Sequence, residues 1–114
     1  MVINGIELDF SIFDADTADK YETAIQDTRD RLANLQDVLQ AEGIGNMIRS
    51  ACQAVFECFN TIFGKGADRK IFGDQVNFQI CMDAFMELDT KVAQEIQDYV
   101  RVMNTYSAAR VKRQ

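Results

Sequence analysis

The last third of the chain carries an apolar stripe with the spacing of one helix face. Apolar side chains recur there every three or four residues, which is the period of an α-helix and not of a strand. The stripe consists of Cys81, Phe85, Leu88, Val92, Ile96, Tyr99, Met103 and Tyr106. The sequence has no proline, and nothing inside the stripe resembles a helix cap or a breaker. The pattern therefore predicts one long helix over residues 74–108.

Two earlier stripes predict two further helices, over residues 16–42 and 45–63. The apolar face of the second is the broader one, which is typical of a central and largely buried helix. Between this helix and the last one, residues 64–73 contain three glycines. They predict a structured loop in which Ile71 and Phe72 form a hydrophobic plug.

The start of the chain predicts a short β ribbon over residues 1–10. Apolar and acidic side chains alternate from residue 6 to residue 10, which is the period of a half-buried strand. Asn4 and Gly5 precede this alternation and favour a type I′ hairpin turn. A two-stranded ribbon is marginal in water, so we expect it to pack against the helices.

The chain has 114 residues, of which 47% are hydrophobic, and this size favours one domain, residues 1–114, over two that would each lack a core. The expected fold is mainly α. It is a three-helix antiparallel bundle with a long C-terminal helix and a short N-terminal β-hairpin.

Histidine is absent, and this limits the chemistry that the chain can perform. Without it there is no Ser-His or Cys-His dyad, no imidazole metal ligand and no imidazole acid or base at neutral pH. We therefore expect a protein that is not an enzyme, with no catalytic residue, no cofactor and no bound metal.

The three cysteines, Cys52, Cys58 and Cys81, have neither the number nor the spacing of a disulfide framework or a zinc knuckle. Cys52 and Cys81 lie on the apolar stripes, where small buried hydrophobes are the ordinary role of a thiol. No secretory signal is readable at the N-terminus, and charged and polar residues interrupt the most apolar stretch, residues 44–63. These observations predict a reduced, cytoplasmic protein without a membrane span.

Acidic residues outnumber basic ones 18 to 12, which gives a net charge of −6 and argues against nucleic-acid binding. The charge is also segregated. Residues 1–43 carry ten acids and three bases, whereas residues 100–114 carry four bases and no acid. The basic tail, residues 109–114, is expected to attract the acidic front of another subunit, although exposed ion pairs contribute little individually.

Two motifs resemble ligand sites without meeting their requirements. The acids Asp14, Asp16 and Asp19 lack the glycine and glutamate spacing of an EF-hand, so helix capping is the better interpretation. Gly64-Lys65-Gly66 lacks the spacing of a P-loop. Six phenylalanines gather around the loop and its flanking helices, and they predict a core, with a ligand pocket as the alternative.

The distal end of the last helix is the candidate interaction site. At 1.5 Å per residue this helix would span roughly 50 Å, against roughly 39 Å and 27 Å for the other two. Its far end still carries apolar side chains that a monomer would leave in water. We therefore expect a homo-oligomer whose interface contains Tyr99, Val100, Met103 and Tyr106. A frayed amphipathic tail is the alternative.

Several short motifs occur together along residues 1–100. They are the opening Ile3-Asn4-Gly5-Ile6-Glu7-Leu8-Asp9-Phe10 with Ile12-Phe13-Asp14-Ala15-Asp16-Thr17-Ala18, the segments Phe63-Gly64-Lys65-Gly66 and Lys70-Ile71-Phe72-Gly73, and then Asn77 and Cys81-Met82-Asp83-Ala84-Phe85. Together they resemble a family of small proteins encoded in phages and prophages of Firmicutes, similar to siphophage tail assembly chaperones.

This resemblance implies a non-enzymatic function in the cytoplasm of a bacterial host. A protein of this kind binds the long hydrophobic tape-measure protein and keeps it soluble until tube subunits polymerise around it. Two alternatives stay open: an oligomeric helical component of a phage particle, and a general interaction scaffold. A small enzyme or ligand carrier would require a defined pocket or a perturbed ionisable group.

Overall fold

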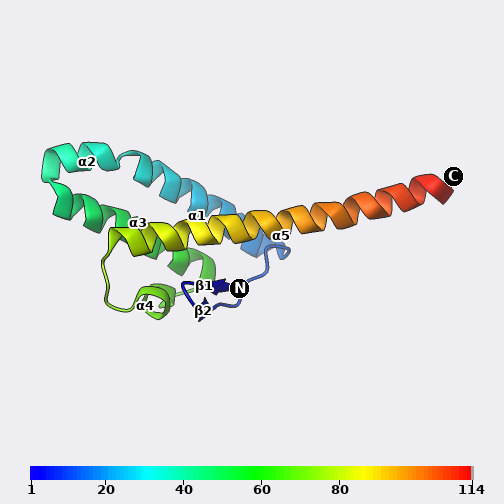
Figure 1. Ribbon diagram of the computed structural model, residues 1–114, viewed down its shortest axis with the longest axis horizontal. Helices are drawn as coiled ribbons and strands as arrows, with labels where there is room; N and C mark the ends of the chain where they lie inside the picture. Colours follow the sequence, from blue (N-terminus) through cyan, green and yellow to red (C-terminus); the bar gives the residue numbers. More distant parts are fainter. Residues whose placement is uncertain (114) are drawn as a thin grey trace.

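The structure is a computed structural model that describes the backbone of residues 1–113 and the side chains of residues 1–107. The described chain is mainly α-helical with one short antiparallel hairpin, as the sequence predicts (Figure 1). In chain order the elements are β1 (Val2–Ile3), β2 (Ile6–Glu7), α1 (Ala15–Ala33), α2 (Leu35–Glu42), α3 (Ile44–Phe63), α4 (Ala67–Phe72) and α5 (Phe78–Arg113).

The hairpin turns at Asn4 and Gly5, as predicted, and both residues have positive φ angles, 51° and 77°. A type I′ turn requires this conformation at both central positions, and Asn and Gly adopt it at the lowest cost. Each strand has only two residues, with Ile3 paired to Ile6. The ribbon is therefore shorter than the predicted residues 1–10, because the chain beyond Glu7 leaves the strand conformation.

The hairpin packs on the helices, as expected for so small a ribbon. Ile3 is completely buried in the core. The backbone N–H of Asn4 donates to Glu87 Oε1 on α5 at 2.7 Å, and its side-chain amide donates to the carbonyl oxygen of Ile71 on α4 at 2.8 Å. Lys91 on α5 donates to the carbonyl oxygen of Val2. These contacts join the hairpin to two helices that follow it much later in the chain.

The predicted helix over residues 16–42 is in fact two helices, α1 and α2, separated by Asn34. Asn34 has φ −94° and ψ 3°, and its backbone N–H donates to the carbonyl oxygen of Arg31 at 3.2 Å. The break is a single residue, so the apolar stripe keeps its spacing across it. Both helices pack against α3, and the break changes the direction of the chain between them (Figure 1).

Helix α3 is the central helix, as its broad apolar face predicts. Cys52, Val55 and Phe59 are completely buried. Helices α1, α2, α4 and α5 all contact this helix.

The predicted loop over residues 64–73 contains the short helix α4. Gly66, just before it, and Gly73, just after it, both have positive φ angles, which side chains with a Cβ disfavour. Ile71 and Phe72 are buried, so the predicted hydrophobic plug is confirmed. The Phe72 ring lies 5.6 Å from that of Phe59 in an edge-on arrangement, and this contact seats α4 on α3.

Helix α5 begins at Phe78, four residues later than predicted, because Asn77 caps it. Its side-chain oxygen accepts the backbone N–H of Ile80 at 3.0 Å. The helix continues to Arg113 instead of ending at residue 108. The side chains of the predicted basic tail, residues 109–114, lie outside the part that the structure describes.

The outer half of α5 projects from the rest of the chain, which we call the body and which includes the first half of α5 (Figure 1). The whole molecule measures 64 × 28 × 22 Å. Helix α5 accounts for most of this length, and α2 with the turn into α3 extends beyond its first residue. Among the described residues, no helix has a stretch long and apolar enough to cross a membrane.

Candidate functional site

The apolar stripe of α5 passes from the core onto the molecular surface. Leu88 and Val92 are buried, and Val92 is only 1% exposed. One turn later Ile96 is 44% exposed, and Tyr106, at the end of the stripe, is 71% exposed. The same side of the helix that packs against the body therefore continues beyond it.

All four side chains predicted for the interface are exposed: Tyr99, Val100, Met103 and Tyr106. At about 100° of rotation per residue, these four lie with Ile96 and Val102 within an arc of about 160° around α5. The opposite arc is polar and consists of Gln97, Asp98, Arg101, Asn104 and Thr105. The projecting part of α5, residues 96–107, is thus amphipathic, and its apolar half is uncovered.

Tyr99 has a partner within the chain, which the sequence did not predict. Its ring lies 4.6 Å from that of Phe13, with an angle of 34° between the ring planes. Phe13 stands just before α1 and is itself 54% exposed. Next to it, Phe10 contacts Phe63 at 5.4 Å between ring centroids. Phe10 therefore packs toward the core, and Phe13 packs on the base of the projecting helix.

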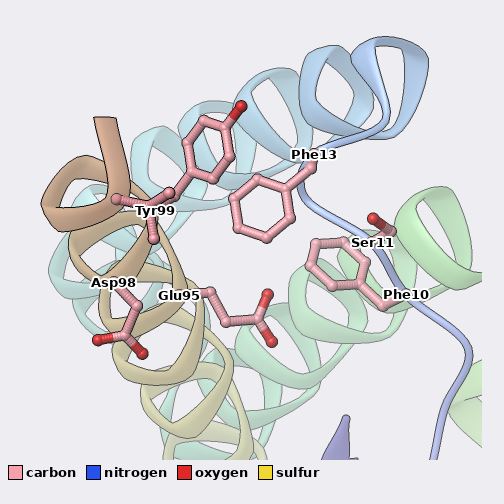
Figure 2. A pocket seen from close by; sticks show the side chains of 7 residues that line it. Phe10, Ser11, Phe13, Glu95, Asp98 and Tyr99 are labelled. Atoms are coloured by element: carbon pink, nitrogen blue, oxygen red, sulfur yellow. The ribbon is translucent and has the colours of Figure 1, made fainter. Parts of the chain in front are cut away.

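An open groove of about 480 Å³ lies where the chain before α1 meets α5 (Figure 2). We call it the aromatic groove. It is lined by Phe10, Ser11, Phe13, Glu95, Asp98, Tyr99 and Val102. Two carboxylates therefore stand beside three aromatic rings at the point where α5 leaves the body.

The two carboxylates of the aromatic groove have different surroundings. Asp98 accepts a hydrogen bond from Gln94 at 3.1 Å, and Arg101 lies 3.6 Å from it. Glu95 is half-buried, and within residues 1–107 no cationic nitrogen lies within 4.0 Å of its carboxylate. In Figure 2 the Glu95 carboxylate is directed toward the Phe10 and Phe13 rings, whereas that of Asp98 points away. Glu95 therefore supplies the negative charge inside the aromatic groove.

The cysteines contribute no reactive thiol to this site. All three are buried, so the expected core role of Cys52 and Cys81 is confirmed. Burial raises the pKa of Cys58. Burial and the neighbouring Cys52 together raise the pKa of Cys81 to about 12. A protonated thiol is a poor nucleophile, and these groups pack as small hydrophobes.

Two polar contacts between α1 and α5 meet at Asp89. Tyr21 donates its hydroxyl to Asp89 at 3.2 Å, and Arg29 lies 2.9 Å from the same oxygen. Burial, followed by the charge of Asp89, raises the pKa of Tyr21, so its hydroxyl stays protonated. This network fixes α5 against α1 just before the helix leaves the body.

The structure shows what surrounds the two motifs that resemble ligand sites. Asp14 is the N-cap of α1 and accepts the backbone N–H of Thr17 at 3.1 Å, so the capping interpretation is confirmed. Lys65, between the two glycines of its motif, lines a cavity with Lys70, Glu7 and Asp9, in which the two charge signs balance.

Sequence reasoning finds the exposed half of α5 but misses the aromatic groove beside it. The alternation of the N-terminal segment places Phe10 in a strand, and Phe13 stands outside every periodic pattern. No local pattern relates Phe13 to Tyr99, because the two are far apart in the sequence. Glu95 resembles any other charge on a solvated helix face.

Comparison with known proteins gives a family but no function. No curated protein and no solved structure matches the chain. The sequence profile of a family of unknown function, DUF6673, matches residues 4–114. Because this match covers nearly the whole chain, the protein belongs to the DUF6673 family.

Proposed function

We propose that this protein is a non-enzymatic helical interaction protein that acts as a tail assembly chaperone and binds the tape-measure protein of a phage. The observation that carries the interaction role is the apolar stripe that leaves the core at Val92 and continues uncovered to Tyr106. The choice of client, the phage context and the bacterial cytoplasm rest on the sequence resemblance described above.

In this proposal the body is a platform that holds α5 in place. Helix α1 runs opposite to α3 and α5, whereas α3 and α5 run in the same direction because the chain returns through α4 between them (Figure 1). The platform is therefore not the antiparallel bundle that the sequence predicts, and α2 extends it. Contacts of α3 with both α1 and α5 support this arrangement, and so do the hydrogen bonds that Tyr21 and Arg29 donate to Asp89. Such a platform leaves the projecting half of α5 free for a partner.

The exposed face suits a helical partner. An apolar arc of about 160° is wide enough to pack into the groove of another amphipathic helix, or between two of them. A long hydrophobic tape-measure protein offers many such helices. The excess of acid elsewhere on the chain supports a solubilising role, because net charge opposes aggregation of the complex.

Self-association uses the same face in this proposal. A fully exposed apolar side chain gains about 1.5–3 kcal/mol on full burial. Tyr99, Val100 and Met103 are about half exposed and Tyr106 is 71% exposed, so each would gain part of this amount, whether a second copy or a client covers it. The homo-oligomer and the client complex therefore compete for one surface.

The test is co-expression of the chain with segments of a phage tape-measure protein. We expect the intact chain to keep a segment soluble and to be purified with it. The double variant Tyr99→Glu, Met103→Glu should lose both effects, because it places two charges on the apolar arc. The matched control is Gln97→Glu, Thr105→Glu, which adds the same charges to the polar arc.

Equal solubilisation by both double variants would refute a role of this face. Circular dichroism of each variant establishes that the helices are retained. A structural component of the phage particle would be present in purified virions, whereas a chaperone would be absent, and immunoblotting separates these two functions.

A further inference from the structure

We infer that the aromatic groove receives the basic C-terminal end of α5 from a second copy of this chain, so that two α5 helices pair antiparallel. The inference rests on the self-association proposed above and adds its geometry. It names Glu95 as the group that recognises the partner.

The groove is suited to a cation. Glu95 is half-buried without a cationic partner among residues 1–107, and a partly desolvated charge gains from being paired. The aromatic rings of Phe10, Phe13 and Tyr99 line the same groove (Figure 2). Ring faces attract cations, and the flat guanidinium of an arginine can stack on them while it binds a carboxylate.

The required cations lie at the far end of the same helix. Beyond Asp98, α5 carries no acid, and the sequence places Arg110, Lys112 and Arg113 in its last two turns. Position 113 is about 27 Å from position 95 along a straight helix, so the basic end cannot reach its own groove. A second copy can place its basic end there.

One register satisfies both copies at once. If a two-fold axis crosses the helix pair beside Asn104, position 113 of each copy lies opposite position 95 of the other. Val102 then lies opposite Tyr106. At about 100° per residue, positions 95, 102, 106 and 113 fall within an arc of about 40°, so all four lie on one side of α5. This side is acidic at one end, apolar in the middle and basic at the other.

The antiparallel arrangement also leaves room for the two bodies. Each body ends near the level of Tyr99, where Phe13 contacts α5. In this register the bodies are separated by about ten residues of helix, or about 15 Å. Both grooves are filled and the dimer is closed, as two-fold symmetry requires. A parallel pair would instead place Glu95 against Glu95.

Charge reversal provides the test, with sedimentation equilibrium of the intact chain at low salt as the measurement. Glu95→Arg alone and Arg113→Glu alone should each raise the dimer dissociation constant about tenfold or more, because each creates two like-charge contacts per dimer. An equimolar mixture of the two variants should dimerise with about wild-type affinity, since every contact in the mixed dimer is again between opposite charges.

The matched controls are Asp37→Arg, an exposed acid on α2, and Arg101→Glu on the polar arc of α5; both should dimerise like the wild type. Glu95→Gln is a second, neutral variant that disturbs the groove least. It should weaken dimerisation less than Glu95→Arg, and mixing it with Arg113→Glu should restore dimerisation only in part, because the mixed dimer has one opposite-charge contact where the wild type has two.

Distinct outcomes separate this inference from the proposed function. If both reversed variants dimerise like the wild type while Tyr99→Glu, Met103→Glu is monomeric, the face associates but this register is wrong. If mixing restores nothing, the cation in the groove is not that of a second copy. If the wild type is monomeric up to high micromolar concentration, this inference and the proposed self-association both fail.

Discussion

At the scale of single residues, Glu87 decides how the hairpin is held. It accepts the backbone N–H of Asn4 at 2.7 Å and lies 3.0 Å from Lys91. The hydrogen bond from Asn4, and then the contact with Lys91, lower the pKa of Glu87 in the folded protein. A carboxyl group with a lowered folded pKa adds stability above its unfolded pKa, and this stability is lost as the pH falls through the folded value.

We predict that Glu87→Gln lowers the free energy of unfolding by about 1 kcal/mol at pH 7, because a charge-assisted hydrogen bond becomes a neutral one. Below the folded pKa the two proteins should be equally stable, since Glu87 is then protonated. Urea unfolding at a series of pH values from 7 down to 2 measures both differences. Asp83→Asn on the exposed side of the same helix is the control, and a loss that stays equal over the whole series would contradict the prediction.

Two phenylalanines show how burial decides the effect of a substitution. Phe59 is completely buried and its ring lies 5.6 Å from that of Phe72, whereas Phe13 is exposed on one side. We predict that Phe59→Ala lowers the free energy of unfolding by about 3–5 kcal/mol through the cavity it leaves. Phe13→Ala should cost about 1 kcal/mol or less. Thermal unfolding followed by circular dichroism compares them, and similar midpoints would show that the core is assigned incorrectly.

At the scale of elements, α5 serves two purposes along its length. Its first half, as far as Val92, is a core helix that contacts α3 and the hairpin. Its second half projects, and only Tyr99 among the predicted interface residues is packed against another aromatic ring of the chain. The stability of the body therefore depends on the first half and on the contact of Tyr99 with Phe13.

We predict that a chain ending at Val100 folds with a free energy of unfolding within about 1 kcal/mol of the full-length monomer. The deleted residues bury no core side chain among those described, so folding loses little. The same chain should be monomeric in sedimentation equilibrium at concentrations where the intact protein associates. A loss of cooperative unfolding would show that the outer half of α5 supports the fold.

At the scale of the whole molecule, charge and shape act together. The acidic residues of the segment 1–43 lie in the body, and the basic end of α5 projects away from it in a molecule 64 Å long, so attraction between them acts between copies. Exposed charges of this kind are screened by salt over a distance of about 8–10 Å.

We predict that raising the salt concentration from 50 mM to 500 mM weakens self-association of the wild-type protein severalfold, as measured by sedimentation equilibrium. For Glu95→Gln the salt dependence should be smaller, because one of the paired charges is gone. An association that strengthens with salt would indicate a purely apolar interface.

The sequence by itself determined the elements whose residues interact over short distances. Helical spacing placed α3 and the stripe of α5, Asn4 and Gly5 determined the hairpin turn, and the same spacing indicated the amphipathic end of α5. These features depend on the local backbone and on a repeating choice between polar and apolar side chains.

Only the tertiary structure decided how distant residues meet. The one-residue break at Asn34 leaves the apolar spacing unchanged, so periodicity predicted a continuous helix where the packing on α3 uses two. The aromatic groove forms because the chain before α1 brings Phe13 against Tyr99 at 4.6 Å. Contacts between residues far apart in the chain depend on the path of the chain through space, which local patterns do not specify. Because this path brings Phe10 and Phe13 beside α5, Glu95 lies in a groove, whereas in the sequence it resembles any other charge on a helix surface.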